Sequence, residues 1–136
     1  MEAKGAITFI EYKVKKVFFE INEKFEDESV SIEFIPSSNV LVDRLANIMT
    51  VDLEVKVFPD PYKKNYPFSM DIVIEGVFRV LDEEEDDILK YKTNAIAILF
   101  PYIRSIITTY TAAANVAPLI LPTINVNKML ENVDSK

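Results

Sequence analysis

Residues 48–58, IMTVDLEVKVF, alternate apolar and polar side chains without interruption from Met49 to Val57. Successive side chains of a β-strand point to opposite faces of its sheet, so this alternation predicts a strand with one buried face. The side chains expected on that face are Met49, Val51, Leu53, Val55 and Val57. The stretch therefore indicates a sheet that is covered on one side and solvated on the other.

Residues 68–81, FSMDIVIEGVFRVL, show the same alternation. Phe68, Ile74 and Phe78 belong to the apolar face, while Asp71 and Glu75 belong to the other face. The intervening PDPYKKNYP is rich in residues that favour chain reversal. The two strands are therefore expected to form an antiparallel hairpin.

Two β-rich segments precede this hairpin. In VSIEFI, residues 30–35, Val30, Ile32 and Phe34 lie on one side of a predicted strand. In residues 6–21, AITFIEYKVKKVFFEI, the alternation changes phase near Lys15 and Lys16. A β-bulge would explain this change, because it inserts one extra residue into a strand.

Beyond the strands the apolar period becomes helical, with Ile96, Leu99 and Ile103 at helical spacing. Pro101 predicts a break or kink near Phe100. A short final helix is expected in NVNKMLENV, residues 125–133. Four strands followed by helices predict one α+β domain over residues 1–136, with an antiparallel sheet carrying a long kinked helix and a short C-terminal helix on one face.

The composition argues against several classes of function. The chain has neither histidine nor cysteine, so it lacks the commonest general base, the commonest zinc ligand and any thiolate. The acidic run DEEEDD, residues 82–87, lacks the alternate spacing of a calcium loop. A net charge of −7 argues against a nucleic-acid surface. We predict no enzyme activity, no cofactor, no metal and no nucleic-acid partner.

Residues 105–127 contain no charged side chain. The segment includes APLILPTINV, residues 117–126, in which two prolines exclude one continuous helix and argue against a membrane span. Leu119, Leu121 and Ile124 could belong to an ordinary core. They could equally form the wall of an apolar groove or a subunit contact.

The C-terminal half resembles SecB, the bacterial protein-export chaperone. The resemblance is carried by Phe100-Pro101-Tyr102-x-Arg104 and by Ile124-Asn125-Val126, at matching spacing. It extends more weakly to KKVFFE, residues 15–20, and DIVIEGVF, residues 71–78. The family usually reads Phe-Pro-Tyr-Ala-Arg and Val-Asn-Phe at the first two places.

The resemblance implies a cytoplasmic homotetramer, built as a dimer of dimers, that holds unfolded polypeptides in apolar grooves and keeps precursors competent for export. The expected groove residues are Phe25, Phe68, Leu119, Leu121 and Ile124. The uncharged helix is expected to be covered by neighbouring subunits. The expected interface residues are Ser105, Ile106, Ile107, Thr109, Tyr110 and Ala112.

The family's docking surface for the translocase motor SecA is acidic, and the resemblance carries Glu20 and Asp71 over to it. Lys16 and Ser69 stand where the family has aspartate and leucine. Two alternatives to general export remain open. One is a SecB-like chaperone dedicated to a single partner, such as the antitoxin of a toxin–antitoxin system. The other is a domain that binds a small apolar ligand.

Overall fold

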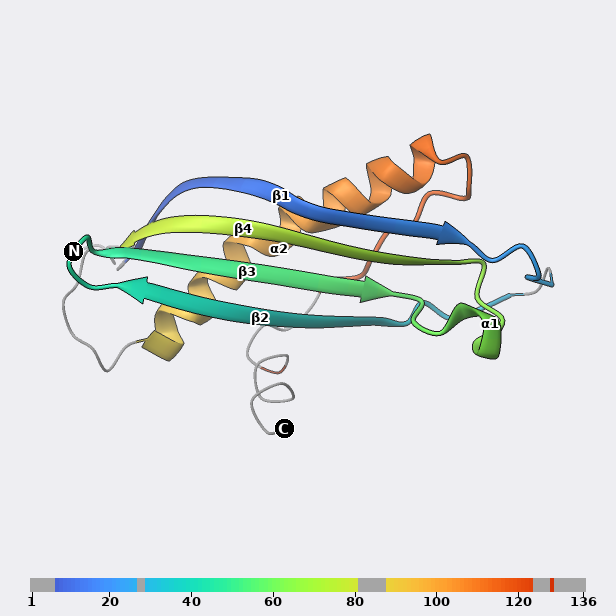
Figure 1. The fold of residues 1–136 in the computed structure, drawn as a ribbon, viewed down its shortest axis with the longest axis horizontal. Helices are drawn as coiled ribbons and strands as arrows, with labels where there is room; N and C mark the ends of the chain where they lie inside the picture. Colours follow the sequence, from blue (N-terminus) through green and yellow to red (C-terminus); the bar gives the residue numbers. More distant parts are fainter. Residues whose placement is uncertain (1–6, 27–28, 81–87, 124–127, 129–136) are drawn as a thin grey trace.

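A four-stranded antiparallel sheet carries one long helix on a single face (Figure 1). The computed structural model describes residues 7–26, 29–80, 88–123 and 128. The elements are β1 (Ile7–Ile21), β2 (Phe34–Asp43), β3 (Ile48–Val57), α1 (Pro61–Lys64), β4 (Phe68–Val80) and α2 (Ile88–Ala113). The strand order is β1-β4-β3-β2, which confirms the predicted α+β fold class. The predicted helix at residues 125–133 lies, apart from Lys128, outside the described residues.

The central hairpin of β3 and β4 follows the alternation of the sequence. The two strands pair antiparallel from Ile48 opposite Arg79 to Val57 opposite Met70. The apolar side chains of both strands are buried beneath α2: Met49, Val51, Leu53, Val55, Val57, Phe68, Met70, Ile72, Ile74 and Phe78. The connection contains α1, and Asp60 and Asn65 flank this short helix with left-handed backbone conformations. This part of the prediction is confirmed.

The predicted bulge in β1 is also confirmed. The register between β1 and β4 shifts between Val14 and Lys16, and a second shift lies between Phe9 and Glu11. Each shift adds one residue to β1 and changes which side chains face the helix. As a result Lys15 and Lys16, although adjacent in sequence, both form ion pairs with carboxylates of the sheet.

The predicted first half of β2 is wrong, because the strand begins at Phe34 rather than near Val30. Phe34 pairs with Val57, the last residue of β3, so the residues before Phe34 have no partner in that strand. Pro36 is tolerated because β2 is an edge strand. The strand lacks clean alternation, and its position is set by pairing with β3.

Helix α2 runs from Ile88 to Ala113 without the predicted break at Pro101. Proline removes the hydrogen bond to the carbonyl four residues earlier, which belongs to Ala97. Ala97 and Pro101 are both exposed, so water can reach the released carbonyl and the helix can continue. By length and composition α2 could cross a membrane, but Ile96, Leu99 and Ile103 are fully buried, as in a core helix.

Gly76 sets how closely α2 approaches the sheet. An added Cβ at this position would lie 2.7 and 2.8 Å from the two Cδ atoms of Leu99 on α2. Leu99 is fully buried, so its methyl groups fill the space that any other residue at position 76 would need. The absence of a side chain at Gly76 therefore allows this helix–sheet contact.

Candidate functional site

The chain reverses direction at the end of α2. Asn115 adopts a left-handed conformation, with φ of 66°. The N–H of Val116 donates to the carbonyl of Thr111 and that of Asn115 to the carbonyl of Ala112, which is the Schellman pattern of a helix end. Residues 117–123, which we call the strap, then run back alongside α2 (Figure 1).

Three side chains of α2 hold the backbone of the strap. The hydroxyl of Thr108 donates to the carbonyl of Leu119 at 2.7 Å, and the hydroxyl of Thr111 accepts the N–H of the same residue at 2.9 Å. Further along, Nε of Arg104 donates to the carbonyl of Leu121 at 3.1 Å. We call Arg104, Thr108 and Thr111 the backbone-binding row.

The side chains of the strap alternate between core and solvent. Leu119 and Leu121 are buried in the same cluster as the sheet and α2, whereas Ile120 is 67% exposed. Ile120 lies over a shallow depression of about 210 Å³, whose other lining residues are Pro101, Arg104, Ser105 and Thr108. The uncharged strap is therefore an extended peptide that contributes two leucines to the core.

A continuous row of aromatic rings crosses the helix-facing side of the sheet. Ring centroids are 4.6 Å apart for Tyr66 and Phe58, 5.2 Å for Phe58 and Phe68, and 5.1 Å for Phe68 and Phe19. The row ends at Tyr110 of α2, 5.4 Å from Phe19, and Tyr110 is 39% exposed. Phe58 has a positive φ of 53°, a costly conformation for a bulky residue.

The segment after β1 is fastened beside the start of β4. The amide of Asn22, which is 4% exposed, donates to the carbonyls of Pro61 at 3.1 Å and Tyr66 at 2.9 Å. Its backbone N–H bonds the carbonyl of Pro67, and its own carbonyl accepts the N–H of Phe25. These bonds place the segment that carries the half-buried Phe25 beside the backbone of Tyr66, at the opposite end of the aromatic row from Tyr110.

Three of the predicted groove residues lie in the core of the molecule rather than at its surface. Phe68, Leu119 and Leu121 belong to one buried cluster, and Phe25 lies near the start of β4. Because both leucines are buried, the side chain that the strap presents to solvent is Ile120, which sequence analysis did not select. Ile124 lies outside the described residues.

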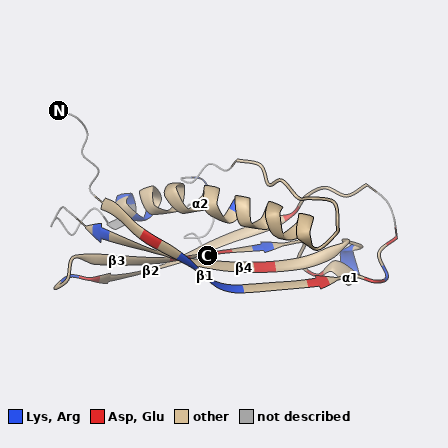
Figure 2. Cartoon of the chain, turned by 90° about the horizontal axis from the view of Figure 1, so that it is seen from above, with Lys and Arg blue, Asp and Glu red and all other residues tan. Residues whose placement is uncertain are grey.

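The predicted interface residues divide between two faces of α2. Ser105, Thr109, Tyr110 and Ala112 are exposed, and Ile106 is half-buried. Ile107 is fully buried against the chain's own sheet, so in this structure it is a core residue. Figure 2 shows α2 as a layer along one side of the sheet, with few charged residues along its length.

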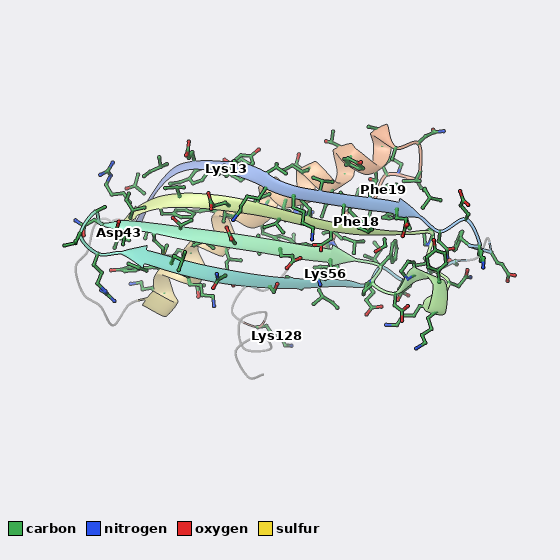
Figure 3. The ribbon with its side chains drawn as sticks, in the orientation of Figure 1. Lys13, Phe18, Phe19, Asp43, Lys56 and Lys128 are labelled. Carbon is green, nitrogen blue, oxygen red and sulfur yellow. The ribbon has the colours of Figure 1, made fainter. Side chains whose placement is uncertain are left out.

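The other face of the sheet carries a ladder of ion pairs between lysines of β1 and carboxylates of β3 and β4. Lys13, labelled in Figure 3, belongs to it and lies 3.5 Å from Glu75. Lys15 lies 3.1 Å from Asp52 and 3.5 Å from Glu75, and hydrogen bonding to Asp52 raises the pKa of Lys15. Lys16 lies 3.2 Å from Asp71. Of the two predicted SecA-facing acids, Glu20 is exposed, whereas Asp71 is already paired with Lys16.

Glu54 on β3 is close to Asp71 in the same ladder. A hydrogen bond with Asp71 and, to a smaller extent, burial raise the pKa of Glu54 above its usual value. One carboxylate oxygen of Asp71 is buried without a hydrogen-bond partner, and a protonated Glu54 can donate to it. Among the described residues, no group of three or more acids could hold a metal ion.

Sequence reasoning missed the backbone-binding row and most of the aromatic row. The sequence does contain a signal for the backbone-binding row, because Arg104, Thr108 and Thr111 recur at the spacing of one helix face. The second has no comparable signal, because Phe19, Phe58 and Tyr66 come from segments far apart in the chain.

Comparison with known proteins gives a family match over most of the chain. The SecB family, described as preprotein translocase subunit SecB, matches residues 12–135. An uncharacterized protein of Methanocaldococcus jannaschii is 33% identical over 141 residues, covering 98% of this chain and 90% of that protein.

Two solved structures share the fold. The Rv1957 SecB-like chaperone of Mycobacterium tuberculosis, in complex with a ChAD peptide from the Rv1956 HigA1 antitoxin, is 14% identical, with a TM-score of 0.71 over 88% of each chain. A protein of unknown function from Streptococcus agalactiae has a TM-score of 0.52 at 14% identity, covering 89% of this chain and 100% of that one. With its four-stranded sheet, its long helix and a family match over residues 12–135, this chain belongs to the SecB family.

Proposed function

We propose that this protein is a SecB-like molecular chaperone that binds unfolded polypeptides and keeps precursors competent for export. The observation that carries the proposal is the uncharged, partly exposed surface formed by residues 105–123, which comprise the C-terminal part of α2 and the strap. A soluble monomer usually places charged residues on the outer face of such a helix. The structural likeness to a SecB-like chaperone that was solved with a peptide supports the proposal.

The proposed groove follows the aromatic row and the strap. Unfolded clients differ in sequence, so recognition must rely on apolar area and on backbone contacts. The exposed ring of Tyr110 supplies apolar area, and the extended strap beside α2 offers a place for backbone contacts. The proposed groove residues are Phe25, Phe68, Leu119, Leu121 and Ile124, together with Tyr110 and Ile120 at the surface.

We further propose that the protein acts in the cytoplasm as a homotetramer, without catalysis or cofactor. On the exposed part of α2, the side chains of Ser105, Thr109 and Ala112 are small and uncharged, which suits close packing against another copy. Light scattering at micromolar concentration should return the mass of four chains. A stable monomer under those conditions would contradict the proposed assembly.

A specific observation favours a chaperone dedicated to one partner as the second candidate. Lys16 lies 3.2 Å from Asp71 and neutralises one of the two acids proposed to face SecA. The antitoxin peptide bound to the Mycobacterium tuberculosis chaperone provides a precedent for a single client. Co-purification from the native cell should yield many precursors for the export role and one predominant protein for the dedicated role.

Binding to SecA tests the export role separately. If Glu20 and Asp71 contribute to docking, reversing both to lysine should weaken SecA binding, and salt should weaken it as well. Sheet content, measured by far-UV circular dichroism, should not change. Absence of SecA binding by the unaltered protein at low salt would favour the dedicated-partner role.

The groove itself is tested with an unfolded protein as the probe. Tyr110→Ser removes the exposed end of the aromatic row, and we expect roughly fivefold weaker binding of fluorescent carboxymethylated α-lactalbumin, equivalent to about 1 kcal/mol. Leu45→Ser is the control, because Leu45 is fully exposed in the turn between β2 and β3, at the opposite end of the sheet from Phe68. Equal losses in both variants, with assembly intact, would contradict the proposed location. Stabilisation by a small apolar ligand without peptide binding would instead indicate a ligand-binding domain.

A further inference from the structure

The strap is bound to α2 in the manner of an extended peptide ligand. The hydrogen bonds from the backbone-binding row go to main-chain atoms of Leu119 and Leu121, the alternate residues whose side chains are buried. Ile120, the residue between them, is 67% exposed. The row therefore contacts every second residue of an extended chain and requires only that the buried side chains be apolar.

The spacing of the row matches the repeat of an extended chain. Thr108 and Arg104 are four residues apart, which corresponds to a rise of about 6.0 Å along a helix. The two carbonyls that they bind are two residues apart, which corresponds to about 6.6 Å along a strand. Because these lengths nearly agree, α2 can bind successive alternate residues without bending the bound chain.

Nothing in these contacts is specific to the strap. The polar partners of Arg104 and Thr108 are backbone carbonyls, and every polypeptide offers those. Two of the strap's seven residues are prolines, Pro118 and Pro122, so the strap itself offers few N–H donors. Thr111 uses the one donor at Leu119 and also donates its hydroxyl to the carbonyl of Ile107 at 2.9 Å.

We propose that Arg104, Thr108 and Thr111 form a backbone-binding site for an extended client segment with apolar residues at alternate positions, and that the strap occupies this site until a client replaces it. The inference rests on the proposed chaperone function and specifies its binding mode. The inference changes the role of Leu119 and Leu121: their side chains occupy the site that the client would fill, so they compete with the client for it.

A fluorescent peptide with the sequence of residues 115–123, NVAPLILPT, is the first probe. In Leu119→Ser with Leu121→Ser the strap no longer fits its own site, so this variant should bind the peptide at least tenfold more tightly than the unaltered protein. A peptide with serine at the position of Ile120 should bind equally well, because that side chain is exposed. A peptide with N-methyl-leucine at the position of Leu119 should bind more weakly, because it lacks the N–H that Thr111 accepts.

A covalent lock provides the second test and does not depend on removing core residues. The chain has no cysteine, so Ser105→Cys with Ile120→Cys introduces a unique pair beside one depression. Closing the pair with a disulfide, or with a bis-maleimide where the disulfide does not form, should reduce binding of the peptide and of carboxymethylated α-lactalbumin at least tenfold. The reduced form of the same protein is the control, because it carries the same two substitutions and differs from the locked form only in the crosslink.

The outcomes separate this inference from the function on which it rests. If the unaltered and reduced proteins bind neither probe, the chaperone function itself fails. If the locked and reduced forms bind the unfolded protein equally, the function stands and strap exchange is wrong. Strap exchange is also overturned if the double serine variant, with helix content and mass retained, binds the peptide no more tightly than the unaltered protein.

Discussion

Replacing Gly76 by alanine should destabilise the protein mainly through its contact with Leu99. The new Cβ would lie 2.7 and 2.8 Å from the Cδ atoms of Leu99 and 3.0 Å from Cε1 of Phe78, and both side chains are fully buried. Overpacking of this kind typically costs about 1–3 kcal/mol. The smaller conformational entropy of the unfolded chain offsets about 0.4–1 kcal/mol. We therefore expect the free energy of unfolding to fall by about 1–2 kcal/mol.

A double-mutant cycle tests the assignment of this cost to Leu99. Leu99→Ala alone should cost about 2–5 kcal/mol, because it leaves a cavity. In that background Gly76→Ala should cost nothing, because the new methyl group enters the vacated space. Urea unfolding at one fixed protein concentration provides the measurement, since assembly would otherwise change the apparent stability. An equal cost of Gly76→Ala in both backgrounds would refute the reasoning.

Two further substitutions test the polar contacts. The raised pKa of Glu54 means that folding favours the protonated carboxyl. This carboxyl therefore stabilises the folded state at low pH, and the stabilisation is lost as pH rises through the folded pKa. Glu54→Gln should therefore raise the melting temperature at pH 7 by about 1–3 °C, with no gain below pH 4; an equal gain at both pH values would contradict the carboxyl pairing. Asn22→Ala leaves the carbonyl of Tyr66 without its amide donor, whereas that of Pro61 still accepts the N–H of Tyr66, and the change should cost about 1–3 kcal/mol in urea unfolding. A loss below about 0.5 kcal/mol would show that water replaces the amide.

The sequence predicted the parts of the fold in which burial has a regular period. β3 and β4 follow from alternation, and the phase change at Lys15 and Lys16 correctly indicated a bulge. β2 was misplaced because Pro36, Ser37 and Ser38 interrupt its apolar pattern and pairing with β3 sets its limits. At Pro101 the sequence allowed a break or a kink, and the break is excluded because α2 continues through this exposed residue, where water can reach the released carbonyl of Ala97.

The site was less predictable than the fold. The sequence indicated that residues 117–126 were unusual, but it could not show that Leu119 and Leu121 turn inward while Ile120 turns outward. The orientation of these side chains depends on the hydrogen bonds that Leu119 makes with Thr108 and Thr111, which lie on α2. The neutralisation of Asp71 by Lys16 likewise depends on a register shift in β1.

The short connection between α2 and the strap has a consequence for selectivity. Only Ala114, Asn115 and Val116 separate the helix from the strap, so the strap competes for its site at an effective concentration on the order of millimolar, as for short tethers in general. A short peptide at micromolar concentration competes poorly against such a tethered segment. A long unfolded chain that contacts the sites of several copies gains from avidity, because each further contact is intramolecular. The tether would thus make the assembly respond to the length of exposed unfolded chain, and folded proteins or short fragments would leave the strap in place.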